Sequence, residues 1–123
     1  MSALFNEIPE VYEFHETGDH PCFYVFIRLS SKDDSGATKT IVAMGRNRFG
    51  HSYIADNFWH YHVEGKNIDI DISGGGFIDI NETEKKMCVF GKSERYGHAN
   101  HDLAVAILSN FFPEWDIKNT TPP

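Results

Sequence analysis

The clearest hydrophobic pattern in the chain is the alternation of isoleucine and aspartate over residues 68–72. It places three isoleucines on one face of an extended segment and two aspartates on the other, as a strand with one buried face requires. The alternation resumes at residues 77–80, after the three glycines 74–76. Because glycine adopts backbone conformations closed to other residues, we expect the glycines to form a sharp reversal or a bulge between two strands.

Further strands are predicted on both sides of this segment. Residues 22–29 are almost continuously apolar or aromatic, which is typical of a strand buried on both faces. Residues 40–44 and 86–90 are shorter runs rich in residues that favour strands, and residues 115–118 predict a last short strand. Residues 1–10 show no such pattern, and we expect them to form an irregular leader.

Two helices are predicted, over residues 51–63 and 99–111. In the first, apolar side chains recur at helical spacing at Ile54, Phe58 and Tyr61 or His62. In the second, we expect the buried stripe to be Leu103, Ile107 and Phe111, with Pro113 ending the helix. Strands and helices in this order predict an α/β protein of the α+β type, with a mixed, mostly antiparallel sheet covered by helices.

Composition and charge narrow the class of protein. A chain of 123 residues with 41% hydrophobic and 24% charged residues is typical of one globular domain, so we predict that residues 1–123 form a single domain. The formal net charge is −7, and no basic stripe or cluster suggests a nucleic-acid or membrane partner. Cys22 and Cys88 are isolated, and no secretory signal or apolar span is seen, so we expect a cytoplasmic protein with reduced thiols.

His51 is the first candidate for chemistry, because it follows Gly50 at the predicted start of a helix. The first turn of a helix presents backbone N–H groups without intrahelical partners, and the helix dipole adds positive potential there. Together these form an anion site, and the same potential disfavours protonation of the imidazole. A neutral histidine can then act as a base or a nucleophile. The alternative is a surface histidine with no role.

Residues 91–97 form the second candidate site. Lys92, Ser93 and Arg95 provide two cations and a hydroxyl, a set that suits phosphoryl oxygens, and the flanking glycines allow close approach of the backbone. The segment lacks the spacing of a P-loop, and an ordinary solvated loop is the alternative. Arg46 and Arg48 precede His51 and can contact a ligand bound near it, or lie in an exposed loop.

The remaining histidines do not predict a metal site. His60 and His62 are two positions apart and point in different directions on a helix. His98 and His101 have suitable spacing, but no carboxylate or thiolate at ligand spacing completes a set. We therefore expect neither a metal nor a cofactor.

The chain resembles the phosphohistidine phosphatases of the Janus/Ocnus family over nearly its whole length. A pattern of three glycines followed by Tyr-Gly-x-Ala-x-His carries most of the resemblance, and the spacing between residues 41–42 and His51 matches the family's catalytic histidine. The residues concerned are Ile8, Pro9, Val11, Tyr24, Val25, Ile27, Arg28, Ile41, Val42, Gly74, Gly75, Gly76, Ile78, Lys85, Lys86, Val89, Phe90, Gly91, Ser93, Tyr96, Gly97, Ala99 and His101.

The resemblance implies a Janus-like fold, with one sheet of about six strands flanked by two helices. It implies a monomeric, metal-free phosphatase whose partners are phosphohistidine-containing proteins. It maps the catalytic histidine onto His51 and the phosphate pocket onto the backbone of His51 and Ser52 and onto Ser93 with its neighbours. Two cations of the family pocket are replaced, a Lys by Phe23 and an Arg by Phe77.

The predicted function is therefore hydrolysis of the P–N bond of phosphohistidine, with His51 as either base or nucleophile. Lys92 and Arg95 stand where family members often have uncharged residues, and we expect them to supply the missing positive charge. The two lost cations motivate a second hypothesis, a non-catalytic phosphoryl-binding module. A third is an interaction protein that uses exposed aromatic side chains such as Trp59, Tyr61 and Phe77.

Overall fold

A computed structural model describes residues 5, 7–14, 22–32, 36–46 and 50–120, with all their side chains except those of Phe14 and Arg46. The order of elements is strands, helix, strands, helix, strand. The strands are β1 (Val11–Phe14), β2 (Cys22–Ser31), β3 (Thr38–Arg46), β4 (Ile68–Asn81), β5 (Lys86–Phe90) and β6 (Asp116–Asn119), and the helices are α1 (Gly50–His62) and α2 (His101–Phe111).

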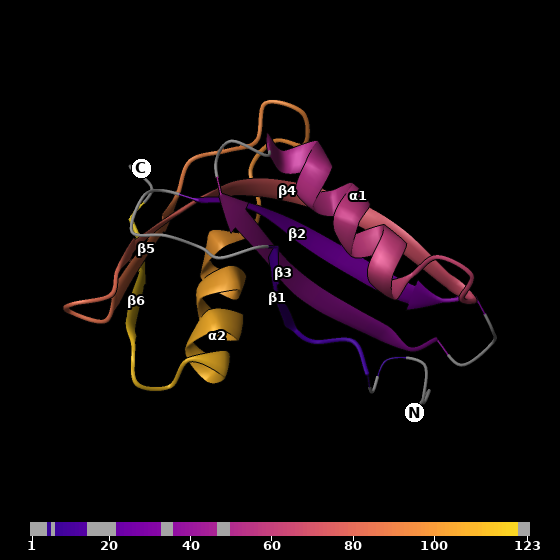
Figure 1. The fold of residues 1–123 in the computed structure, drawn as a ribbon, viewed down its shortest axis with the longest axis horizontal. Coiled ribbons are helices and arrows are strands. Elements are labelled where there is room, and N and C mark those ends of the chain that lie inside the picture. The colour runs from indigo at the N-terminus through magenta and orange to yellow at the C-terminus, as the bar shows by residue number, and fades with distance from the viewer. Residues whose placement is uncertain (1–4, 6, 15–21, 33–35, 47–49, 121–123) are drawn as a thin grey trace.

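The described strands form one mixed sheet in the order β1-β3-β2-β4-β5-β6 (Figure 1). β2 pairs antiparallel with β3 and β4, and β4 pairs antiparallel with β5. The outer pairs, β1 with β3 and β5 with β6, are parallel. This arrangement confirms the predicted α+β class, the mostly antiparallel sheet and the two helices. Within the described part of the chain, no helix is long and apolar enough to cross a membrane.

Two hydrophobic cores lie on opposite faces of the sheet, because neighbouring residues of a strand point to opposite sides. On β2, Tyr24 and Phe26 belong to the core beneath α2, whereas Val25 and Ile27 belong to the core beneath α1. We name these sides the α2 face and the α1 face. The prediction that residues 22–29 are buried on both sides is confirmed, and it explains why their apolar run is nearly unbroken.

The glycines 74–76 do not reverse the chain. β4 continues through them as one strand, and its register with β2 shifts between Phe26 and Ile27. Phe26 is opposite Gly74 and Ile27 is opposite Ile72, so Ser73 is the extra residue of a β-bulge. The Ser73 hydroxyl donates a hydrogen bond to the carbonyl of Phe26, 3.3 Å away. Of the two expectations for the glycines, the reversal is wrong and the bulge is correct.

The prediction of the buried stripe on α2 is also wrong. The buried side chains are His101, Ala104 and Leu108, whereas Leu103 is 42% exposed and Phe111 47% exposed. The helix begins at His101 rather than at residue 99, after Asn100, whose side chain accepts a hydrogen bond from the N–H of Leu103 at the helix start. The buried face follows His101 because that side chain enters the sheet, as described below.

The other differences are small. β1 was not predicted, because only four residues pair at the edge of the sheet and they include the polar Glu13. In α1, Ile54 and Phe58 are buried as expected. Of the two candidates for the next position, His62 is half-buried and Tyr61 is exposed.

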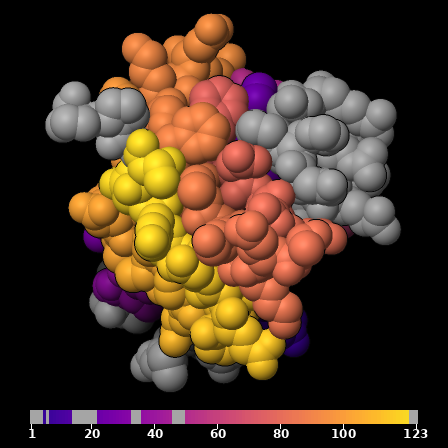
Figure 2. All heavy atoms as spheres, turned by 90° about the vertical axis from the view of Figure 1, so that its left-hand side faces the viewer, coloured from indigo at the N-terminus to yellow at the C-terminus, as the bar shows by residue number. Residues whose placement is uncertain are grey.

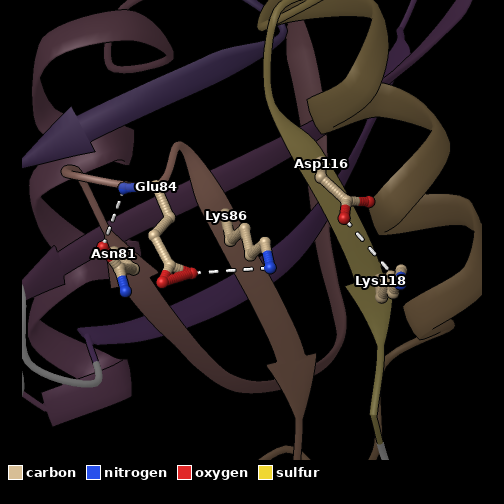
Figure 3. Close-up of polar contacts among 5 residues, drawn as sticks. All are labelled: Asn81, Glu84, Lys86, Asp116 and Lys118. Atoms are coloured by element: carbon tan, nitrogen blue, oxygen red, sulfur yellow. Dashed lines mark hydrogen bonds and ion pairs between the residues drawn. The ribbon is translucent and has the colours of Figure 1, made fainter.

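Polar contacts lie at the turn between β4 and β5 and along the edge strand β6 (Figure 3). The side-chain oxygen of Asn81 accepts a hydrogen bond from the N–H of Glu84, 3.0 Å away. Glu84 and Lys86 pair across the turn at 3.4 Å, and Asp116 and Lys118 pair along β6 at 3.8 Å. These ion pairs are exposed, so each contributes at most about 1 kcal/mol.

Candidate active site

A pocket of about 350 Å³ opens where the first turn of α1 meets the loop that follows β5. In Figure 1 this loop, drawn in orange, lies beside the start of α1. In Figure 2 the same orange residues stand at the top of the molecule, above β6 in yellow. The pocket is lined by Phe23, Gly50, His51, Ser52, Phe77, Lys92, Ser93, Glu94 and Arg95.

His51 lies in the first turn of α1, and local backbone geometry places it there. Gly50 has a φ of 72°, a left-handed conformation that favours glycine, and it allows the chain to enter the helix sharply. None of the residues of the first turn is acidic, so no carboxylate of the helix offsets its positive end. His51 is 8% exposed and still lines the pocket.

A hydrogen bond to the sheet determines the tautomer of His51. Its Nε2 lies 2.9 Å from the carbonyl oxygen of Gly76. Because a carbonyl oxygen only accepts hydrogen bonds, Nε2 must carry the hydrogen, and in the neutral ring Nδ1 holds the free lone pair. The bond therefore makes Nδ1 the basic and nucleophilic atom of the neutral His51.

Two phenyl rings enclose the imidazole. Phe23 is stacked on it, with ring centroids 4.4 Å apart and an interplanar angle of 18°. Phe77 meets it edge-on at 5.6 Å and meets Phe23 in the same way at 4.9 Å. This apolar burial lowers the pKa of His51 below its ordinary value, while the bond to Gly76 and the negative charge of Glu94 oppose the shift. Phe23 and Phe77, at positions where the resemblance implies a Lys and an Arg, thus favour the neutral imidazole.

Ser93 organises the loop on the other side of the pocket. Its side-chain oxygen accepts hydrogen bonds from the N–H groups of Arg95 at 3.2 Å and Tyr96 at 3.1 Å, and Ser93 is only 1% exposed. The backbones of Ser93 and Gly97 exchange two further hydrogen bonds, at 2.9 and 3.1 Å. With its oxygen accepting two bonds, the Ser93 hydroxyl still has a hydrogen to donate.

Gly75 lies where the two sides of the pocket meet. A Cβ atom at this position would lie 3.0 Å from Cδ2 of His51, 3.1 Å from Cβ of Ser93 and 2.6 Å from the carbonyl oxygen of Tyr24. The N–H of Gly75 also donates to the carbonyl of Gly97, 3.0 Å away, which ties the loop to β4. The absence of a side chain at Gly75 therefore lets His51 and Ser93 approach each other.

The charged groups of the pocket come from the same loop. Lys92 and Arg95 form no ion pair with any described residue, so their charges are not neutralised by a neighbouring carboxylate of that part of the chain. The guanidinium of Arg95 lies 5.6 Å from the ring centre of Tyr96, a cation–π contact that orients it. Glu94 is the acidic side chain among the lining residues.

A second histidine lies behind the pocket, on the α2 face. The Nε2 of His101 donates a hydrogen bond to the carbonyl of Gly91 at 2.7 Å, and its Nδ1 accepts one from the hydroxyl of Tyr24. Both side chains are buried, and burial raises the pKa of Tyr24. A Cβ on Gly76 would lie 2.7 Å from Cε1 of His101. The hydrogen bonds from Tyr24 to His101 and from His101 to Gly91 therefore hold the start of the loop that carries Ser93.

The structure brings most of the predicted site residues together. The same pocket is lined by His51, Ser52, Lys92, Ser93 and Arg95. Arg46 ends β3, and its side chain lies outside the described part of the chain, as does the whole of Arg48. No group of three or more His, Cys, Asp or Glu side chains is placed to hold a metal ion among the residues described.

Sequence reasoning missed two features of this site. Phe23 and Phe77 were noted as lost cations, but their packing on the imidazole was not foreseen. Glu94 was not selected, although it lies between two residues that were. The signal for Glu94 was available, because a charged residue between Ser93 and Arg95 in a short loop has to lie near them.

Comparison with known proteins identifies the family. A family model described as the Janus/Ocnus family (Ocnus) matches residues 5–116, nearly the whole chain. The chain belongs to the Janus/Ocnus family. This match includes every residue of the pocket, and the family assignment made from sequence motifs is confirmed.

The chain is similar to two kinds of curated proteins in this family. It is 30% identical over 98 residues to the 14 kDa phosphohistidine phosphatase of Homo sapiens, which covers 76% of this chain and 78% of that protein. The corresponding protein of Sus scrofa is 29% identical over 98 residues. The sex-regulated protein janus-A of Drosophila pseudoobscura pseudoobscura is 26% identical over 105 residues, covering 79% of this chain but 66% of the relative.

Proposed function

We propose that this protein is a metal-free phosphatase that hydrolyses the P–N bond of phosphohistidine in other proteins, with His51 as its central residue. The observation that carries the proposal is the environment of His51. Its Nε2 is engaged by Gly76, its ring is enclosed by Phe23 and Phe77, and it lines a pocket with two cations. A neutral imidazole with a free Nδ1 beside an anion site is the requirement for attack on phosphorus.

The other residues have supporting roles in this proposal. Backbone N–H groups at the start of α1, together with Ser93, Lys92 and Arg95, hold the phosphoryl oxygens and stabilise their charge as the P–N bond breaks. His51 either takes the proton of the attacking water or attacks phosphorus itself through Nδ1. Both routes need the same uncharged ring, so both predict the same loss when His51 is replaced.

Family membership supports the proposal at a coarser level. Two relatives bear the name phosphohistidine phosphatase, and others bear the name janus-A, which states no activity. A second candidate function, a non-catalytic phosphoryl-binding module, is favoured by one observation. Phe23 and Phe77 occupy the positions where the family pocket usually has a Lys and an Arg, so phosphate is held by fewer cations on that side.

Turnover of a phosphohistidine peptide and binding of inorganic phosphate together separate the two functions. Release of inorganic phosphate by the wild-type protein, lost in His51→Ala and retained in His60→Ala, would support the enzyme. His60 is an exposed histidine of the same helix, paired with Glu64, and is the matched control. Binding of inorganic phosphate without turnover would support the module. The absence of both binding and turnover would contradict the proposal and leave an interaction protein as the remaining hypothesis.

A further inference from the structure

Glu94 is an unexpected group in a pocket proposed to bind phosphate. Glu94 lines the pocket with His51, Lys92 and Arg95, and it forms no ion pair with a described residue. It is close enough to His51 for its negative charge to act on the pKa of the imidazole. A carboxylate repels the oxygens of a phosphoryl group and attracts a positive charge, so Glu94 suits a ligand that carries a positive group beside its phosphoryl group.

The aromatic side of the pocket favours the same kind of ligand. Phe23 and Phe77 line the pocket together with Glu94, and phenyl rings pack well against other flat rings. The pocket thus has two chemically different sides. Lys92, Ser93 and Arg95 suit the oxygens of a phosphoryl group, whereas Glu94 and the two rings suit a flat, positively charged group next to it.

We propose that Glu94, with the phenyl rings of Phe23 and Phe77, binds the leaving imidazole of the substrate as its imidazolium ion. This inference rests on the proposed function and deepens it. It makes the substrate class a phosphoramidate whose leaving nitrogen belongs to a protonated ring, and it sets such substrates apart from phosphate esters of uncharged alcohols and phenols.

The hydrogen that the substrate ring donates to Glu94 stays on that ring throughout the reaction. The ring nitrogen that is not bonded to phosphorus carries a hydrogen, which it donates to the carboxylate of Glu94. When the P–N bond breaks, its electron pair returns to the other ring nitrogen, so the imidazolium leaves as neutral imidazole and keeps its hydrogen. Phosphorus gains the oxygen of water, whose proton goes to Nδ1 of His51 if His51 is the base. Glu94 remains a carboxylate throughout.

The test compares Glu94→Gln with the wild-type protein on a phosphohistidine peptide and a phosphotyrosine peptide. Glutamine keeps the size and removes the charge, and Glu82→Gln, on the exposed turn between β4 and β5, is the matched control. We expect kcat/KM for phosphohistidine to fall about ten-fold or more in Glu94→Gln, as for the loss of a hydrogen bond to a charged group. For phosphotyrosine it should stay the same or rise. An equal change for both peptides would overturn the inference.

A binding measurement keeps this inference separate from the proposed function. Calorimetry with (imidazol-4-yl)methylphosphonate and benzylphosphonate at pH 6 compares a cationic ring with a neutral ring on the same phosphonate. We expect the wild-type protein to prefer the cationic ring about ten-fold and Glu94→Gln to lose the preference. Equal binding of both ligands by the wild-type protein would overturn the inference even if phosphohistidine is hydrolysed. The preference without any hydrolysis would uphold it while the proposed enzyme fails.

Discussion

The imidazole of His51 is stacked on the phenyl ring of Phe23, with the two ring centroids 4.4 Å apart. Phe23 packs on the α1 face of β2, at a position where the resemblance to the family implies a lysine. A cation at this position would act on a bound phosphoryl group, whereas the phenyl ring acts on the histidine. In the proposed site the positive charge therefore comes from the loop with Lys92 and Arg95, and the environment of His51 is apolar.

The pH dependence of activity follows from this environment. Burial lowers the pKa of His51, and the neutral ring is the active form in the proposed mechanism. We expect kcat/KM for a phosphohistidine peptide not to decline as the pH falls through the ordinary histidine range near 6.5, and to decline only below it, when the His51 ring takes up a proton. A pH–rate profile and an NMR titration of the His51 ring should give the same midpoint.

Phe23→Ala tests the cause assigned to that shift. Removing the ring admits water to the imidazole, so the midpoints of the NMR titration and of the pH–rate profile should both rise toward the ordinary value. Phe112→Ala, on the other side of the sheet, should leave the His51 midpoint unchanged. A midpoint that does not move in Phe23→Ala would show that the stacked ring does not set the pKa of His51.

Arg95 and Lys92 are expected to hold the phosphoryl group. Replacing Arg95 with Ala should weaken binding of inorganic phosphate about ten-fold or more, because a hydrogen bond to a charged group is lost, and Lys92→Ala should act in the same direction. Calorimetric titration measures both effects. Lys118→Ala, on β6 outside the pocket, is the control. Unchanged phosphate binding in Arg95→Ala would contradict the compensation proposed for the missing cations of β2 and β4.

Gly75 is expected to be required for both folding and activity. In Gly75→Ala the added Cβ atom would lie 2.6–3.1 Å from atoms of Tyr24, His51 and Ser93. This crowding should lower the free energy of unfolding by about 1–3 kcal/mol. Urea unfolding measures the loss. Gly65→Asn is the control, because Gly65 has open space around it and a φ of 79° that asparagine tolerates. A Gly75→Ala protein as stable and active as wild type would refute the close approach.

The hydrogen bonds that link Tyr24, His101 and Gly91 behind the pocket are expected to stabilise the fold. Tyr24→Phe removes the donor to Nδ1 of His101 and leaves a buried acceptor without a partner, which should lower the free energy of unfolding by about 1–3 kcal/mol. Tyr61→Phe, on the exposed side of α1, should change it by less than about 0.5 kcal/mol. Equal unfolding free energies of Tyr24→Phe and wild type in urea would show that these hydrogen bonds do not stabilise the fold.

Much of the fold was predictable from local periodicity. β5 begins and ends where the sequence pattern places it, and the alternation of residues 68–72 identifies the exposed and buried sides of β4 correctly. These predictions succeed because the spacing of apolar residues directly reflects which side of a strand is buried. The predicted pocket residues of the 91–97 loop also came together, since three of them are close in sequence.

The remaining features depend on contacts between distant segments. Whether three glycines turn or continue a strand is decided by the pairing of β4 with β2, which places Gly75 beside His51 and Ser93. His101 forms hydrogen bonds with Tyr24 and with the carbonyl of Gly91, and these determine which side of α2 is buried. The prediction instead followed the spacing of larger apolar residues and was therefore wrong. No local sequence pattern predicts the hydrogen bond from the His51 ring to the carbonyl of Gly76.

Chemical rescue of His51→Ala tests the central claim most directly. Phosphate release from a phosphohistidine peptide should fall at least about a thousand-fold in this variant, as expected when a catalytic base or nucleophile is removed. Added imidazole should restore part of the rate, because the space between Phe23 and Phe77 then accepts a free ring. A His51→Ala protein that hydrolyses the peptide at the wild-type rate, without added imidazole, would contradict the account.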